Sequence, residues 1–414
     1  MTLKKIIRIF KRFFHILKFL IKYVFYSKIY FKNPPKKKII LFDCDVPNYI
    51  KNLFSKKESL VLSTRSTNIS EIYISKSIIF FLVNNFFKRS IKKNYLIILI
   101  KLISPKVVYT FIDNSPDFYD VSKELENEIK FVAIQQSTRE TRWLPFNWLR
   151  NINLPIYYCL SEWDKSYYIK KKTNVKKFLI SGSLKSSLAL NYIKSKNIKI
   201  NKKKFDICII GERDKIWIKG KSHKYDVFKN RDMSTLVDGE HIKKLSYSAG
   251  QIARYAYKFC KKFKLKMVIA GRSEKDSALR EEELDFYKYY LGTDDFNLIP
   301  NQPEKFSNYI LTLQSRLIIG NDSTLIREAI GMNKKIFACN YSGHSDLDFV
   351  EKKLKKFCTK KNSYEIFEKK VLNILNISEK NYFKYLGKNK DYIMPVSTNF
   401  HKKFKNTIHQ IINT

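Results

Sequence analysis

Three side chains in the last third of the chain have the types and spacing of a phosphate and ribose site. Ser323 and Thr324 closely follow the apolar run at 317–319, and Glu328 comes five residues after Ser323. A helix that begins at Ser323 would direct backbone N–H groups and the positive end of its dipole at a phosphate or diphosphate. A carboxylate at Glu328, on the same helix, could accept hydrogen bonds from both ribose hydroxyls.

The elements that must position these side chains are a strand, a helix and a second strand. Residues 317–319 and 336–339 are apolar runs of strand length. Ser323 is a good N-cap, and Gly331 stands where a helix end favours a left-handed residue. The pattern therefore predicts a helix from about Ser323 to Gly331 between two buried strands.

This arrangement resembles the C-terminal half of GT-B glycosyltransferases. Their pattern is a Ser/Thr turn, then Glu-Ala, then Gly and a strand, which Ser323, Thr324, Glu328-Ala329 and Gly331 match. The resemblance implies a nucleotide-sugar site with Glu328 on the ribose. The alternative, an ordinary strand–helix–strand unit with a buried Glu-Ala pair, stays open.

Other candidates in this half also follow predicted strands. Gly211 and Arg213 come after the strand at 205–210, and Arg272 and Ser273 come after the strand at 266–270. An Arg at this position could bind a diphosphate with two parallel hydrogen bonds. A plain turn at Gly211, and a surface salt bridge for Arg272, are the competing interpretations.

In the first half, Asp113 and Asn114 follow the strand predicted at 107–112, and Arg139 follows the one at 131–134. Asp113 is the leading candidate for the base that takes a proton from an acceptor hydroxyl, and Arg139 could hold an anion.

Other residues compete for the role of base. Asp43 and Asp45 follow the strand at 39–42, and Glu140 and His344 remain further options. A carboxylate at a strand end is often only a helix cap, so no candidate is decided by its position alone.

Lys185 belongs to a small-residue turn, Ser181-Gly-Ser-Leu-Lys185, which resembles the domain-junction turn of Kdo transferases. That resemblance places Lys185 near the charge of the donor. The runs 107–114, 131–136 with Arg139, and 180–185 together resemble bacterial surface carbohydrate biosynthesis proteins over roughly residues 38–190. The chain departs from that pattern at Gln136-Ser137, where an Asn-Gly turn would be expected.

Apolar runs alternate with helical patterns along most of the chain, which is typical of parallel sheets covered on both faces. The predicted fold is α/β, with two Rossmann-like doubly wound domains that face a cleft, as in the GT-B class. We expect an N-terminal acceptor-side domain at 36–193, a Lys-rich linker at 194–204, and a nucleotide-sugar-binding domain with C-terminal helices at 205–414.

Residues 1–35 form a separate segment. Basic residues recur every three to four positions among Ile, Phe, Leu and Tyr, which predicts an amphipathic helix up to residue 32 that Asn33-Pro34-Pro35 ends. The pattern favours a helix lying on an anionic membrane surface. A helix packed on the protein's own core is the alternative.

The chain carries 80 Lys and Arg against 38 Asp and Glu, a formal charge of +42. The chain is also rich in Ile, Asn, Phe and Tyr and poor in Gly, Pro and Ala, a bias that AT-rich coding produces, and we attribute about half of the excess charge to it. No reading module for nucleic acid is evident, so a nucleic-acid binder is the less favoured alternative. The six cysteines form no CxxC pair and the six histidines are scattered. We therefore expect reduced thiols, no bound metal and no cofactor.

The sequence thus predicts a cytoplasmic enzyme, peripheral on the inner face of the cell membrane. It would move a sugar from a nucleotide-sugar donor to a glycan or lipid-linked acceptor in surface polysaccharide synthesis. A polyol-phosphate transferase or a nucleotide-sugar epimerase on the same fold remains the alternative.

Overall fold

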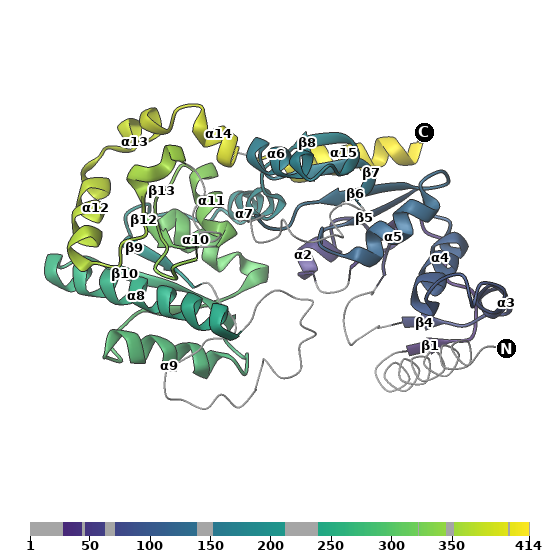
Figure 1. Cartoon of the computed structure of the whole chain (residues 1–414), viewed down its shortest axis with the longest axis horizontal. Helices are drawn as coiled ribbons and strands as arrows, with labels where there is room; N and C mark the ends of the chain where they lie inside the picture. The colour runs from purple at the N-terminus through teal and green to yellow at the C-terminus, as the bar shows by residue number, and fades with distance from the viewer. Residues whose placement is uncertain are drawn as a thin grey trace.

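Two parallel β-sheets of six strands each carry the fold, and a computed structural model shows them side by side (Figure 1). The structure describes residues 28–43, 46–62, 71–138, 152–211, 239–321, 323–344, 352–395 and 398–413. The predicted α/β class and the GT-B arrangement of two doubly wound sheets are confirmed.

The first sheet has the strand order β3-β2-β5-β6-β7-β8. Its strands are β2 (Ile39–Leu41), β3 (Ser59–Val61), β5 (Val107–Thr110), β6 (Lys130–Ile134), β7 (Asn153–Cys159) and β8 (Asn174–Ile180). The helices of this half are α2 (Asn48–Lys51), α3 (Lys76–Asn84), α4 (Ile91–Ile103), α5 (Pro116–Leu125), α6 (Glu162–Lys170) and α7 (Leu184–Ser195).

Alternate residues of these strands enter two different hydrophobic clusters. Ile40 and Val108 lie in one cluster, whereas Leu41 and Tyr109 lie in the other. Because successive side chains point to opposite faces of a sheet, the first sheet is covered on both sides. This burial explains why its strands are continuous apolar runs in the sequence.

The second sheet has the order β11-β10-β9-β12-β13-β14. Its strands are β9 (Phe205–Ile210), β10 (Met267–Glu274), β11 (Leu298–Asn301), β12 (Ser315–Gly320), β13 (Lys335–Cys339) and β14 (Cys358–Thr359). The helices that follow β9 are α8 (Gly239–Phe263), α9 (Arg280–Leu291), η3 (Pro303–Lys305), α10 (Ser307–Gln314), α11 (Thr324–Gly331), η5 (Lys352–Phe357), α12 (Tyr364–Asn376), α13 (Glu379–Leu386), α14 (Asn389–Ile393) and α15 (Phe400–Asn413).

The last helix crosses back to the first half (Figure 1). Phe400, Phe404 and Ile408 recur every four residues along one side of α15 and pack into a cluster of the first sheet. The Phe404 ring lies 5.4 Å from the Tyr109 ring. The sequence predicts that residues 205–414 belong to the second half, and the domain bounds with the linker at 194–204 stay a prediction.

The helix that the sequence predicts up to residue 32 does not include residues 28–30. Residues Lys28–Tyr30 form a strand, β1, that pairs with β4 (Glu71–Tyr73) in a separate two-stranded sheet. Tyr30 stacks on Tyr73 with 5.2 Å between ring centroids, which favours the extended pairing over a further helical turn. Residues 1–27 lie outside the described part. No helix among the described residues is long and apolar enough to span a bilayer.

Gly331 does not have the left-handed conformation that the sequence predicts for it. It is the last residue of α11, and the left-handed residue is Asn333, with φ of 61°. A Cβ atom at Gly331 would lie 2.9 Å from Cγ of Met394. Close packing against the segment after α14 therefore explains this glycine.

The cysteines of the described part are free thiols. Cys159, Cys208, Cys260 and Cys339 are buried, and Cys358 is half-buried. Burial raises the pKa of the Cys208 thiol to about 12. Such thiols behave as small core residues. Cys44 lies outside the described residues.

Candidate functional site

The carboxyl ends of the two sheets face each other. The order of the second sheet reverses between β9 and β12, and ligands of doubly wound sheets bind at such switch points. Near this point the backbone N–H of Thr138, after β6, donates to Oγ1 of Thr324 at 3.2 Å. The Ser183 hydroxyl, after β8, donates to the Glu328 carboxylate. The predicted strand ends of both halves thus meet at one junction.

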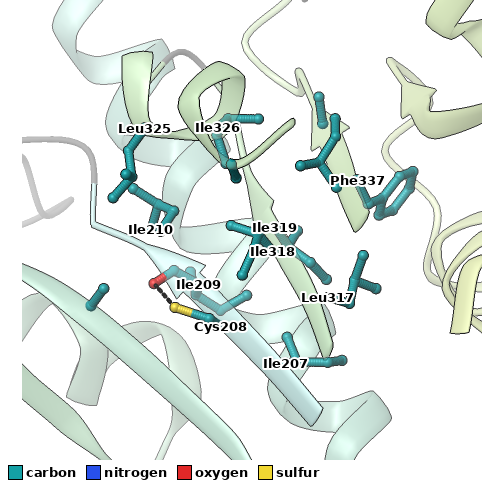
Figure 2. Packing of buried hydrophobic residues seen from close by; sticks show 14 of the residues in the cluster. Ile207, Cys208, Ile209, Ile210, Leu317, Ile318, Ile319, Leu325, Ile326 and Phe337 are labelled. Atoms are coloured by element: carbon teal, nitrogen blue, oxygen red, sulfur yellow. Dashed lines mark hydrogen bonds between the residues drawn. The ribbon is translucent and has the colours of Figure 1, made fainter. Parts of the chain in front are cut away.

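Helix α11 supplies the second half's part of this junction. The Ser323 Oγ accepts a hydrogen bond from the N–H of Leu325 at 3.3 Å and caps the helix, as predicted. Leu325 and Ile326 are buried in the same cluster as Ile210 and Ile319, so the helix is fixed on the ends of β9 and β12 (Figure 2). Its positive dipole end is therefore directed at the first half.

Glu328 is buried at the junction of the two halves, with 3% of its surface exposed. One carboxylate oxygen accepts the Ser183 hydroxyl, and the other accepts the Tyr309 hydroxyl at 2.9 Å. Burial raises the pKa of Glu328, and the Ser183 hydrogen bond and the charge of Lys185 offset this in part. A carboxylate at this place can bind hydroxyl groups, which is the chemistry a ribose requires.

Lys185 approaches Glu328 from the first half. It lies in the first turn of α7, and its Nζ is 5.5 Å from the centre of the Phe111 ring. Burial lowers the pKa of Lys185, the charge of Glu328 raises it, and the charge of Arg272 lowers it. Lys185, Arg272 and Glu328, all predicted as donor-binding residues, therefore lie in one electrostatic neighbourhood.

The end of β10 is held by the carboxylate of Glu283, a residue for which the sequence predicts no role. Glu283, which is buried, accepts the backbone N–H groups of Arg272 and Ser273 at 2.7 and 3.1 Å. A Cβ atom at Gly211 would lie 2.8 Å from the Ala270 carbonyl oxygen, so only glycine fits there. The backbone N–H groups of Arg272 and Ser273 are thus already bonded to Glu283, and a phosphate must be bound by other donors.

Ser273 also has structural partners, since its hydroxyl donates to the Leu279 carbonyl at 3.3 Å. The Arg272 side chain, by contrast, is exposed. Of the two predicted residues, Arg272 is the one whose side chain can reach a ligand.

Asp113 is enclosed by hydrogen-bond donors. Its Oδ2 accepts the hydroxyls of Tyr157 and Tyr168 at 2.7 and 3.0 Å, and its Oδ1 accepts the N–H of Gln136 at 3.0 Å. The side chain is 1% exposed. This geometry is that of an anchor for the loop after β6, and it weighs against a role as a base. Asn114 next to it is partly exposed.

The other two described candidates for the base, Asp43 and His344, differ from each other in burial. Asp43 is fully buried, and its Oδ2 accepts the Thr110 hydroxyl and the N–H of Ile112, so it ties the end of β2 to β5. His344 is partly buried, and its N–H donates to the Ser342 hydroxyl at 3.1 Å.

Several predicted residues lie outside the described part, namely Asp45, Arg139, Glu140 and Arg213. Among the residues that the structure does describe, no three His, Cys, Asp or Glu side chains are grouped to hold a metal ion.

A buried ion pair beside the site joins the two halves. Arg327, next to Glu328 in α11, donates to Oδ2 of Asp164 in α6 at 2.9 Å and to the Ile393 carbonyl at 2.7 Å. Its guanidinium also lies 4.8 Å from the Trp163 ring. Asp164 accepts the Gln135 amide at 2.8 Å. The sequence does not predict this pair, because nothing in the spacing links two residues 163 positions apart.

The family to which the chain belongs is shown by a family model. Residues 169–410, more than half of the chain, match the model of a family described as "putative O-antigen biosynthesis protein". No curated protein matches the chain in sequence.

Solved structures match over nearly the full length. A UDP-GlcNAc 2-epimerase from Neisseria meningitidis bound to UDP-GlcNAc has a TM-score of 0.52 at 11% identity, over 90% of this chain and 99% of that one. MnaA of S. aureus with UDP has a TM-score of 0.53 at 14% identity, over 91% and 97%. A UDP-GlcNAc 2-epimerase from Methanocaldococcus jannaschii, in complex with UDP-GlcNAc and UDP, has a TM-score of 0.51 at 11% identity, over 90% and 99%. At these identities the likeness shows a shared fold.

Proposed function

The chain belongs to the family of O-antigen biosynthesis proteins, and we propose that it is a glycosyltransferase that uses a nucleotide-sugar donor. The acceptor would be a membrane-associated glycan or a lipid-linked sugar. The transfer would take place at the cytoplasmic face of the membrane, where the N-terminal segment would hold the enzyme.

The observation that carries this proposal is the Ser183–Glu328 hydrogen bond across the junction, beside Lys185, on which the charges of Glu328 and Arg272 both act. Lys185 and Arg272, from opposite halves, and the positive end of α11 would together favour the negative charge of a diphosphate. When a glycosidic bond to a nucleoside diphosphate breaks, charge builds on the leaving phosphate. Fixed cations and a helix dipole stabilise that charge more in the transition state than in the ground state.

Glu328 supplies the second part of donor recognition. Its two oxygens already accept hydroxyl hydrogens from Ser183 and Tyr309. Each carboxylate oxygen can accept more than one hydrogen bond, so ribose hydroxyls can join or replace these donors. Ser323 and Thr324, at the start of α11, would lie on the phosphate side of the same ligand.

The acceptor would be bound by the first half. Asn114 is partly exposed after β5, and Arg139 follows the loop that Asp113 anchors. Asp113 stays a prediction as the base, with its tyrosine hydrogen bonds as the argument against it.

A panel of nucleotide sugars tests the proposal. Each would be incubated with the purified protein and a membrane extract, and lipid- or glycan-linked radiolabel would be measured. Transfer of label supports a glycosyltransferase. A changed free nucleotide sugar without transfer would identify an epimerase, and transfer of phosphate with the label would identify a polyol-phosphate transferase. Salt-dependent binding of nucleic acid, with no binding of any nucleotide sugar, would reject the whole class.

A further inference from the structure

Helix α3 is apolar on the side that faces solvent as well as on the side that faces the core. Ile78 is buried, and Phe81 and Leu82 pack against the cluster of the first sheet. On the outer side, Ile79 is 52%, Phe80 is 70% and Val83 is 67% exposed. A surface helix of a globular domain normally carries polar residues there, so this outer side indicates an interaction surface.

Two further aromatic residues extend this surface. Phe87, in the turn after α3, is 67% exposed, and Phe31, after β1, is 82% exposed. The N–H of Ile74 donates to the Tyr30 carbonyl at 2.9 Å, so Phe31 follows directly on the strand end beside the start of α3. We call Phe31, Ile79, Phe80, Val83 and Phe87 the α3 surface. It lies at the end of the molecule away from the second sheet (Figure 1).

Basic residues dominate the sequence around the α3 surface. From Ile72 to Ile112 the chain has seven Lys or Arg and no Asp or Glu, and residues 1–42 have twelve Lys or Arg and again no Asp or Glu. Arg89, Lys92 and Lys93 are paired with acidic residues of α5. Lys76 and Lys88, at the two ends of the surface, are exposed.

We propose that the α3 surface inserts into an anionic lipid bilayer, with its aromatic and aliphatic side chains among the acyl chains and Lys76 and Lys88 at the headgroups. An apolar face bordered by Lys is the pattern of segments that lie in a membrane interface. The residues of this surface belong to the first half and follow the segment 1–27 in the sequence.

The chemistry of the surface favours a bilayer over other partners. A second copy of the chain would bring the same basic residues to the contact and would be repelled. Nucleic acid could stack bases on the Phe rings, but it would leave the exposed aliphatic side chains of Ile79 and Val83 without an apolar partner. Only a lipid surface has both an anionic outer layer and an apolar interior.

The test is vesicle binding by the full-length protein. Vesicles of phosphatidylethanolamine and phosphatidylglycerol would be compared with neutral phosphatidylcholine vesicles by co-sedimentation. The double variant Phe80→Ser, Val83→Ser should bind the anionic vesicles about tenfold or more weakly, because two inserted apolar side chains are lost. The single variant Ile79→Ser should also weaken vesicle binding. Its matched control is Ile169→Ser on α6, where Ile169 is similarly exposed at 54%, and this variant should bind as the unchanged protein does.

A direct measure of insertion complements the binding assay. In Phe80→Trp, the fluorescence of the introduced tryptophan should shift to the blue on anionic vesicles and be quenched by brominated acyl chains. The control Tyr289→Trp on α9 should show neither change. The proposal is overturned if the Ser variants bind vesicles as the unchanged protein does. It is also overturned if their effect is a lowered melting temperature or a changed oligomeric state at constant vesicle affinity, because the surface would then be covered by protein.

Discussion

The hydroxyl of Ser183 donates a hydrogen bond to the carboxylate of Glu328, and this bond joins the two halves of the molecule. Ser183 caps α7 on the first sheet, whereas Glu328 lies in α11 on the second. The Tyr309 hydroxyl occupies the other carboxylate oxygen at 2.9 Å. The residue that the sequence predicts as the ribose ligand is thus held by donors of the same kind as ribose hydroxyls.

Glu328→Gln should weaken binding of the nucleotide-sugar donor. The glutamine keeps the shape of the side chain but has only one acceptor oxygen, and a hydrogen bond to a charged group is worth about 1.5–3 kcal/mol. Isothermal titration should therefore show an affinity loss of roughly tenfold or more. Glu365→Gln, on the exposed side of α12, is the control and should bind as the unchanged protein does. Equal affinity in both variants would remove Glu328 from the site.

The same variant should change how stability depends on pH. Burial raises the pKa of Glu328 above its ordinary value of 4.5, so the folded protein retains a proton that the unfolded chain has released. Where the folded state binds more protons, stability falls as the pH rises. Glu328→Gln removes this loss, so its stability relative to the unchanged protein should increase from pH 4.5 towards neutral. Urea unfolding at several pH values measures this, and a constant difference would contradict it.

The Arg327–Asp164 pair should contribute strongly to stability. Arg327→Leu leaves the Asp164 carboxylate buried without its cation, and such changes cost about 3–5 kcal/mol. Adding Asp164→Leu should restore part of that loss. Arg89→Leu, which breaks the partly exposed pair with Glu124, is the control and should cost less than about 1 kcal/mol. Similar costs for the two single Arg variants in urea unfolding would argue against a buried tie between the halves.

The variant Asp113→Asn distinguishes a structural role of Asp113, as the anchor of the loop after β6, from a role as the catalytic base. The amide would present N–H groups to the Tyr157 and Tyr168 hydroxyls or to the Gln136 N–H, so an anchor should lose about 1–3 kcal/mol of stability. We expect this loss in thermal unfolding, with donor affinity nearly unchanged. If the melting temperature is unchanged and turnover falls by roughly 10²–10⁴-fold, Asp113 is the base and the anchor interpretation fails.

The short buried strands could be predicted from the sequence because their burial on both faces leaves continuous apolar runs. Phe205–Ile210 forms β9 with the predicted bounds, and the strand predicted at 131–134 is β6. The strand β1 could not be predicted, since Lys28–Tyr30 continues the basic and apolar alternation of the preceding segment. Its pairing depends on Tyr73, 43 positions away from Tyr30.

The site was predictable only where a local signal exists. Ser323 and Glu328 share one helix, and Lys185 follows a small-residue turn, so their types and spacing were informative. Tyr309 and Glu283 carry no such signal, because each acquires its role from partners on other elements. The enclosure of Asp113 by Tyr157 and Tyr168 likewise depends on tertiary contacts that a strand-end position does not reveal.

The most direct test of the central claim is equilibrium binding of nucleotide sugars, including the UDP- and CMP-linked types, to the unchanged protein and to Lys185→Met. Lys261→Met, whose exposed side chain pairs with Asp295, is the matched control. If Lys185 and α11 together bind the donor, one nucleotide sugar should bind at one site per chain. Lys185→Met should then lose roughly tenfold or more in affinity, and Lys261→Met should lose none. Equal affinity of Lys185→Met and the unchanged protein, or no binding of any nucleotide sugar, would contradict the account.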